Sequence, residues 1–218
     1  MDKKKLLWTA AVAFVLLAVL YFLPFDIPFK KSFPLAVLFI ASFALQSWAI
    51  VIAMLCSLAG DLAGDLHQFV PQMGFFALAH LCFIGYFLSL GLKNKRAKGK
   101  PVPGWWFALA TVFAVGLFYL ASEKIIPFAP EGVVRTGMYV YAGLIAVMMW
   151  SALMQRDWMW GVGAVLFVIS DMILATTLFV TPVPGKKYLI MVPYYAAQLL
   201  IFVRSAMERQ GWKCLIGA

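Results

Sequence analysis

Residues 158–180 read WMWGVGAVLFVISDMILATTLFV, a run of apolar side chains that contains a single charge, Asp171. An apolar run of about 17–25 residues can cross the hydrocarbon core of a bilayer, which is about 30 Å thick. The whole chain has the same character, since 64% of its 218 residues are hydrophobic and only 12% are charged. A soluble domain usually has about 25% charged residues, so the chain is predicted to be an integral membrane protein.

Runs of this kind recur along the chain and predict an all-α bundle of eight transmembrane helices. The predicted spans cover residues 6–23, 33–47, 48–66, 70–91, 104–122, 133–154, 158–180 and 187–206. Only residues 46–48 separate the second span from the third, which predicts a tight turn there. The spans use nearly all of the chain, so we expect one multi-pass domain, residues 1–218, without a soluble domain.

Lysine and arginine residues are distributed unevenly between the predicted loops. With the N-terminus in the cytoplasm, twelve of them lie on the cytoplasmic side and six on the opposite side. This bias follows the positive-inside rule, so both termini are predicted to be cytoplasmic. In a bacterium the membrane would be the inner, cytoplasmic one. The first span has no small-residue cleavage site after it and is read as an uncleaved helix.

The lysine and arginine residues of these predicted loops also explain the net charge of +9. The basic run KNKRAKGK, residues 93–100, lies beside two predicted spans, where such residues fix topology and attract anionic head groups. We therefore expect bilayer lipid, and not nucleic acid, as a partner. Four tryptophans near span ends are assigned to the interfacial aromatic belt: Trp105, Trp106, Trp158 and Trp160.

The basic loop 93–100 divides the chain into two halves, residues 1–92 and 101–206, with four predicted spans each. Asp61 lies in the third span of the first half, and Asp171 in the third span of the second. The sequences that precede these two residues are loosely similar. This pattern suggests two parallel four-helix repeats, as in some transporters.

Asp61 and Asp171 are the strongest indication of a functional site. A charge at the bilayer centre costs at least about 2.5–3.5 kcal/mol, so it persists mainly where it is used. At a rise of about 1.5 Å per residue, each aspartate lies about 19 Å from the cytoplasmic start of its span. His80 and Gln198 lie about 15 and 16 Å into neighbouring spans. Four polar groups are therefore predicted to converge on one layer near the midplane.

Other polar residues accompany these four at helical spacing. Ser57 lies one turn from Asp61 and shares its face, and Tyr194 has the same relation to Gln198. Ser170 faces away from Asp171 and is expected to bond its own backbone. For Asp65, near the outer interface, a site role and a plain interfacial role are equally compatible with the sequence. For His80 or Gln198 taken alone, a hydrogen-bonding contact between helices is the favoured reading.

Several site classes find no support in the sequence. It contains no phosphate-binding loop, no dinucleotide fingerprint and no nucleophile elbow. Neither the histidines nor the three cysteines, Cys56, Cys82 and Cys214, have the spacing of metal ligands. We therefore predict a site without metal or cofactor.

Four short motifs together resemble the YhhN-type lysoplasmalogenase family. They are Ser57-Leu-Ala-Gly-Asp61 followed by Gly74-x-Phe76-x-x-x-His80, then Tyr141 with Met148, then Gly163-Ala-x-Leu-Phe-x-x-Ser170-Asp171-x-x-Leu-Ala175, and Tyr194-Tyr195-Ala-Ala-Gln198. The resemblance extends over about residues 30–205 and agrees with eight helices. One departure is Gln72, where the family pattern has glycine.

The resemblance implies an ether-bond hydrolase that cleaves the vinyl ether of choline or ethanolamine lysoplasmalogen. Such a bond opens when acid protonates its β-carbon, and water then captures the oxocarbenium ion. Asp61 and Asp171 would act as general acid and base, in either order. Orienting or substrate-binding roles would fall to Ser57, His80, Tyr141, Ser170, Tyr194, Tyr195 and Gln198, with Asp65 as a further candidate.

Two other classes of function fit the residues without the resemblance. Paired intramembrane carboxylates and an internal repeat also suit a small proton-coupled transporter. A non-catalytic lipid-binding or scaffold protein is the third reading. It predicts that neither aspartate is needed for function.

Overall fold

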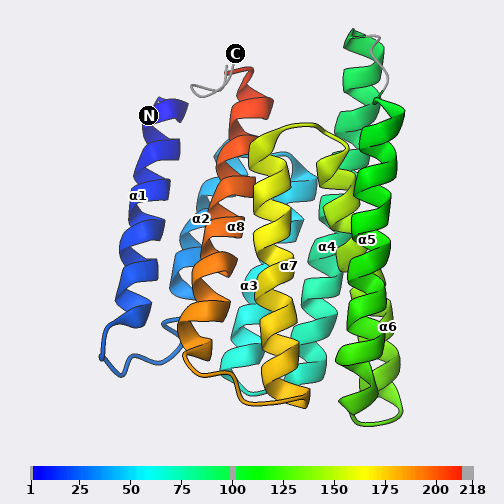
Figure 1. Ribbon diagram of the computed structural model, residues 1–218. Helices are drawn as coiled ribbons and strands as arrows, with labels where there is room; N and C mark the ends of the chain where they lie inside the picture. Colours follow the sequence, from blue (N-terminus) through cyan, green and yellow to red (C-terminus); the bar gives the residue numbers. More distant parts are fainter. Residues whose placement is uncertain (1, 99–101, 213–218) are drawn as a thin grey trace. The chain divides into compact units, whose positions relative to one another are not determined.

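The computed structural model describes residues 2–98 and 102–212, and all regular structure in this part is helical (Figure 1). The elements are α1 (Lys3–Phe22), α2 (Phe33–Leu45), α3 (Trp48–Asp65), α4 (Phe69–Lys98), α5 (Gly104–Lys124), the short 3-10 helix η1 (Ile126–Phe128), α6 (Val133–Leu153), α7 (Trp158–Phe179) and α8 (Lys186–Gln210). Their bounds agree with the predicted spans to within a few residues at most ends, so the all-α fold class is confirmed.

Seven of these helices are long and apolar enough to cross a membrane. The exception is α2, whose 13 residues measure about 20 Å, less than the thickness of a hydrocarbon core. Its first turn contains Pro34, which is well tolerated at that position. Only Gln46 and Ser47 separate α2 from α3, so the predicted tight turn is confirmed.

The predicted loop 93–100 is mostly helix. α4 has 30 residues and continues to Lys98, while residues 99 and 100 lie outside the described part. Hydropathy marks only the part of a helix that lies in lipid, and lysine, arginine and alanine are good helix formers in water. The basic run therefore extends α4 instead of ending it.

By its internal contacts the chain forms two compact units. Unit 1 comprises residues 1–82 and 198–218, and unit 2 comprises residues 83–197, so α4 and α8 each contribute to both. The boundaries of these units, after residues 82 and 197, differ from the basic run 93–100, which was predicted to divide the chain into halves 1–92 and 101–206. The internal repeat and the cytoplasmic placement of both termini stay predictions.

In unit 1, α1 packs on α2, and α2 packs on α3 (Figure 1). Phe14 of α1 and Leu38 of α2 are almost fully buried, as is Ile50 of α3. The turn between α2 and α3 is fixed to α8 because the Gln46 side-chain amide donates a hydrogen bond of 2.8 Å to the carbonyl of Phe202.

In unit 2, α6 packs between α5 and α7. Trp160 is 1% exposed, and its ring lies edge-on to Phe87 with 5.1 Å between the ring centroids. Its predicted place in the interfacial belt is therefore wrong. Trp158 and Trp160 are about 200° apart around a helix of 3.6 residues per turn. Trp158, 47% exposed, consequently faces outward, as does Trp105.

Large apolar side chains cover much of the outer surface of both units. On α5 alone, Val112, Val115 and Tyr119 are each more than 60% exposed. Contiguous apolar surface of this extent is unfavourable in water and is what a helix presents to lipid. Together with the seven long apolar helices, it indicates a multi-pass membrane protein.

Candidate functional site

Asp61 is buried in unit 1 beside a lysine that the sequence did not connect with it. The carboxylate is 2% exposed, and its Oδ1 lies 3.8 Å from Nζ of Lys31. Lys31 precedes α2 by two residues and approaches the last turns of α3. A buried charge needs a compensating partner, and the lysine ammonium supplies one.

The same lysine also approaches Asp65. Its Nζ lies 3.9 Å from Asp65 Oδ1, and the hydroxyl of Ser32 donates a hydrogen bond of 3.0 Å to Asp65 Oδ2. We call Lys31, Ser32, Asp61 and Asp65 the Lys31 cluster. Asp65 is thus part of the surroundings of Asp61, and its carboxylate is held by contacts within the protein.

The Lys31 cluster lies near one end of α3 instead of the middle. α3 ends at Asp65, so Asp61 is four residues, about 6 Å, from that end. α3 begins at Trp48, as predicted, about 19 Å before Asp61, and its 18 residues are long enough to cross a membrane. Asp61 therefore lies closer to the C-terminal end of α3 than to the middle of the helix.

Two glycines of α3 leave room for this cluster: Gly60, which belongs to the predicted motif, and Gly64. A Cβ atom on Gly64 would lie 2.5 Å from Nζ of Lys31 and 2.7 Å from Nε2 of Gln72. A Cβ atom on Gly60 would lie 2.9 Å from the ring of Phe76. Gln72, the departure from the family pattern, therefore occupies space beside Gly64 at the edge of the cluster.

Unit 1 also contains three further predicted site residues, all fully buried: Ser57, His80 and Gln198. Ser57 lies one turn before Asp61 on α3. Its hydroxyl oxygen makes no hydrogen bond with any residue that the structure describes. A buried hydroxyl without a protein partner is costly unless water or a ligand satisfies it, so this position can bind a small polar group.

Unit 2 contains Asp171 and the other predicted residues. The hydroxyl of Tyr141, on α6, donates a hydrogen bond to Oδ2 of Asp171, on α7. Asp171 is partly exposed, in contrast to Asp61. Tyr141 was predicted only from the family motif. Its hydrogen bond to Asp171 links α6 to α7 at these two residues.

Ser170 was expected to bond the backbone of its own helix, but the structure shows a different partner. Its hydroxyl donates a hydrogen bond of 2.9 Å to the carbonyl of Ile190 on α8. On the same helix pair, Tyr194 lies edge-on to Phe167, with ring centroids 5.5 Å apart. Tyr194 and Tyr195 are both buried. Ser170 and Tyr194 thus hold α7 against α8 within unit 2.

The predicted site residues divide between the two units. Ser57, Asp61, Asp65, His80 and Gln198 belong to unit 1, whereas Tyr141, Ser170, Asp171, Tyr194 and Tyr195 belong to unit 2. The common layer predicted for Asp61, Asp171, His80 and Gln198 stays a prediction. Within residues 2–98 and 102–212, no group of three His, Cys, Asp or Glu side chains could hold a metal ion. Cys56 and Cys82 are free thiols, and Cys214 lies outside these ranges.

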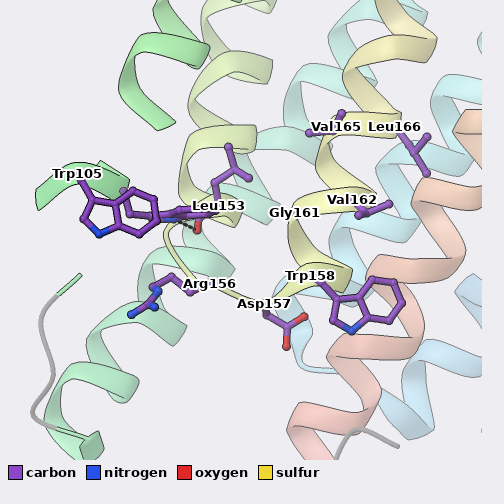
Figure 2. Close-up of a pocket in the computed structure, with 10 residues that line it drawn as sticks. Trp105, Leu153, Arg156, Asp157, Trp158, Gly161, Val162, Val165 and Leu166 are labelled. Atoms are coloured by element: carbon purple, nitrogen blue, oxygen red, sulfur yellow. Dashed lines mark hydrogen bonds between the residues drawn. The ribbon is translucent and has the colours of Figure 1, made fainter. Parts of the chain in front are cut away.

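A pocket in unit 2 was not predicted from the sequence. It has a volume of about 570 Å³ and lies between the beginning of α5, the end of α6 and the beginning of α7 (Figure 2). Its lining combines tryptophans and aliphatic side chains with one basic and one acidic residue: Trp105, Trp106, Leu153, Arg156, Asp157, Trp158, Gly161, Val162, Val165 and Leu166. None of the predicted site residues lines it.

Comparison with known proteins identifies relatives along most of the chain. Human lysoplasmalogenase TMEM86B is 34% identical over 154 residues, which cover 68% of this chain and 59% of the human protein. Bovine lysoplasmalogenase TMEM86A is 32% identical over 158 residues, 67% of this chain and 59% of the bovine protein. Mouse lysoplasmalogenase TMEM86B is 30% identical over 214 residues, 92% of this chain and 87% of its own length.

The chain thus spans 59% of the length of the first two relatives. No solved structure matches it significantly. The model of the YhhN family matches residues 13–205, which include all four motifs and all of the predicted site residues. The resemblance inferred from the motifs is therefore confirmed, and the chain belongs to the YhhN family.

Proposed function

We propose that this protein is a lysoplasmalogenase, which hydrolyses the vinyl ether bond of a lysoplasmalogen to a fatty aldehyde and a glycerophospho-base. Membership of the YhhN family and relatives named lysoplasmalogenase support the reaction. The multi-pass helical fold suits a substrate that is itself a lipid with one long chain. Such a substrate can enter sideways from the bilayer.

The observation that carries the proposal is the pair of membrane-embedded carboxylates with their separate polar partners. Asp61 lies beside Lys31, and Asp171 accepts a hydrogen bond from Tyr141. Each carboxylate thus has a polar partner fixed in its own unit. Fixed partners of this kind can orient a carboxyl group towards a reacting atom.

The reaction needs a proton donor and a base. The donor protonates the β-carbon of the vinyl ether, which gives an oxocarbenium ion. Water then adds to the α-carbon and loses a proton to the base, and the resulting hemiacetal collapses to the aldehyde and the glycerol hydroxyl. In the collapse, the hemiacetal O–H gives its proton to the first carboxylate, and the protonated base gives its proton to the leaving glycerol oxygen. Overall, one water molecule is consumed and both carboxyl groups return to their initial state.

We propose that Asp61 is the ionised base, because Lys31 offsets its negative charge, and that Asp171 delivers the proton. Tyr141 would orient the Asp171 carboxyl group through its hydrogen bond. The unpartnered hydroxyl of Ser57, one turn from Asp61, would hold the attacking water. His80, Tyr195 and Gln198 would position the glycerophosphate end of the substrate.

The test uses purified protein in detergent with vinyl-ether and ester lysolipids of matched chain length. We expect aldehyde from the vinyl ether and no fatty acid from the ester. Asp61→Asn and Asp171→Asn should each lower aldehyde release about 10²–10⁴-fold, while size-exclusion chromatography shows folded protein. Transport in sealed vesicles without aldehyde release in detergent would instead support the transporter reading. Full activity in either variant would remove that carboxyl group from the mechanism.

A further inference from the structure

A second, apolar hollow adjoins the pocket of unit 2. This hollow has a volume of about 240 Å³ and is lined by Trp106, Leu109, Ala110, Phe113 and Leu153. Trp106 and Leu153 line both spaces. The residues of α5 involved recur at helical spacing, so the hollow follows one face of α5 for about 10 Å into the membrane-spanning part.

The wall shared by the two spaces is fixed. The indole N–H of Trp106 donates a hydrogen bond of 2.9 Å to the carbonyl of Leu153, near the end of α6 (Figure 2). Gly161 of α7 leaves space in the pocket beside Leu153, because a Cβ atom at this position would lie 3.3 Å from the Leu153 side chain. The larger volume, about 570 Å³, falls within the range of small-molecule sites.

The mouth of the pocket carries one available positive charge. Arg156 is exposed and forms no ion pair with any residue in the described ranges. The neighbouring Asp157 caps α7, where its carboxylate accepts hydrogen bonds from the backbone N–H groups of Met159 and Trp160. In Figure 2 the Arg156 and Asp157 side chains point in different directions, with Arg156 on the side of Trp105. Arg156 has a φ of 53°, a left-handed conformation that is uncommon for this residue type.

The chemical groups of the pocket are arranged in the same order as those of a phospholipid. Arg156 lies at the mouth, where a phosphate would bind, the exposed tryptophans flank the pocket, and the apolar hollow along α5 suits an acyl chain. Trp105 and Trp158 flank the pocket on opposite sides in Figure 2. The mouth lies on the side that the lysine and arginine count assigns to the cytoplasm, where bilayers are rich in anionic lipids.

We propose that this pocket binds one anionic phospholipid of the bilayer, with its phosphate at Arg156 and an acyl chain in the hollow beside Ala110. Charge complementarity favours an anionic over a zwitterionic head group. The site is separate from the proposed catalytic residues, since Asp171 lies about 180° around α7 from Val162, which lines the pocket. The proposal therefore does not depend on the hydrolase activity.

The test is native mass spectrometry of the full-length protein with an equimolar mixture of dioleoylphosphatidylglycerol and dioleoylphosphatidylcholine. Wild-type protein should retain the anionic lipid in preference. Arg156→Gln should lower that preference about fivefold, the contribution of one basic side chain near an anionic surface. Arg209→Gln is the matched control, because Arg209 is also exposed, at the end of α8 in unit 1, and should leave the preference unchanged.

A second variant tests the apolar part. Ala110→Leu fills the hollow without changing charge and should lower retention of both lipids, with an unchanged helical circular dichroism spectrum. Equal retention of the anionic lipid by Arg156→Gln and Arg209→Gln would overturn the proposal, since general surface charge would then explain binding. The absence of any head-group preference in the wild type would also overturn it.

Discussion

At the scale of single residues, Lys31 changes the interpretation of the candidate site. In the sequence it is one of six basic residues on the predicted outer side, and nothing in the sequence links it to the aspartates. In the structure its ammonium group lies within 4 Å of two carboxylates, at 3.8 Å from Asp61 and 3.9 Å from Asp65. The sequence could not show this contact, because it depends on how the start of α2 packs against the end of α3.

Lys31→Met should destabilise the protein, since it leaves the buried charge of Asp61 without this partner. The expected cost is about 1–3 kcal/mol, and it should fall when Asp61→Asn is added to the same chain. Thermal unfolding in detergent of the two single variants and the double variant measures the coupling. Lys124→Met, at the exposed end of α5, is the control and should have little effect. Strictly additive changes would show that Lys31 and Asp61 do not stabilise each other.

Tyr141 offers a second test at this scale, directed at activity. Tyr141→Phe removes only the hydroxyl that donates to Asp171. A hydrogen bond to the carboxylate that forms as Asp171 gives up its proton is worth about 1.5–3 kcal/mol, so we expect kcat to fall about 10- to 100-fold. Tyr139→Phe changes an exposed residue of the same helix and should retain wild-type kcat. Equal rates for both variants would mean that Tyr141 does not assist Asp171.

At the scale of elements, hydropathy predicted the positions of the helices well, but it did not predict where α4 ends or which face of α7 is buried. Apolar runs are long enough to identify each helix, because the bilayer leaves few alternatives to a helix of that length. The continuation of α4 to Lys98 escaped prediction because basic residues leave the membrane without ending a helix. The burial of Trp160 and the bond from Ser170 to α8 depend on which face of α7 meets its neighbours. A uniformly apolar helix does not reveal that face.

The close approach of α3 to the start of α4 can be tested with two glycine substitutions. Gly64→Ala places a methyl group where Nζ of Lys31 and Nε2 of Gln72 now lie. Both are ends of flexible side chains, so the protein should fold, but Lys31 must move away and aldehyde release should fall. Gly74→Ala, on α4, meets no atom within 4 Å and should be neutral or stabilising by about 0.5–1 kcal/mol. Equal activity of the two variants would show that the position of Lys31 is unimportant for the reaction.

At the scale of the whole molecule, each of the two compact units holds one of the two aspartates. Unit 1 supplies Asp61 with Lys31, and unit 2 supplies Asp171 with Tyr141. α4 and α8 each belong to both units, so the backbone of two helices is continuous between them. The proposed mechanism requires both aspartates to act on the same vinyl ether bond. This requirement can be tested by comparing the rates of the single and double variants.

Residues that act together as a unit in one reaction give non-additive losses when they are replaced. Asp61→Asn and Asp171→Asn should each lower kcat about 10²–10⁴-fold, as expected for the loss of a general acid or base. The double variant should lose about as much as the more damaged single variant, because the slower of the two impaired steps, protonation or water addition, limits the rate. Single-turnover aldehyde release, with protein amounts matched by size-exclusion chromatography, measures the three losses. A double variant whose loss equals the product of the two single losses would show that both carboxyl groups lower the barrier of one and the same step independently, and the proposed division into a protonation step and a water-addition step would then be wrong.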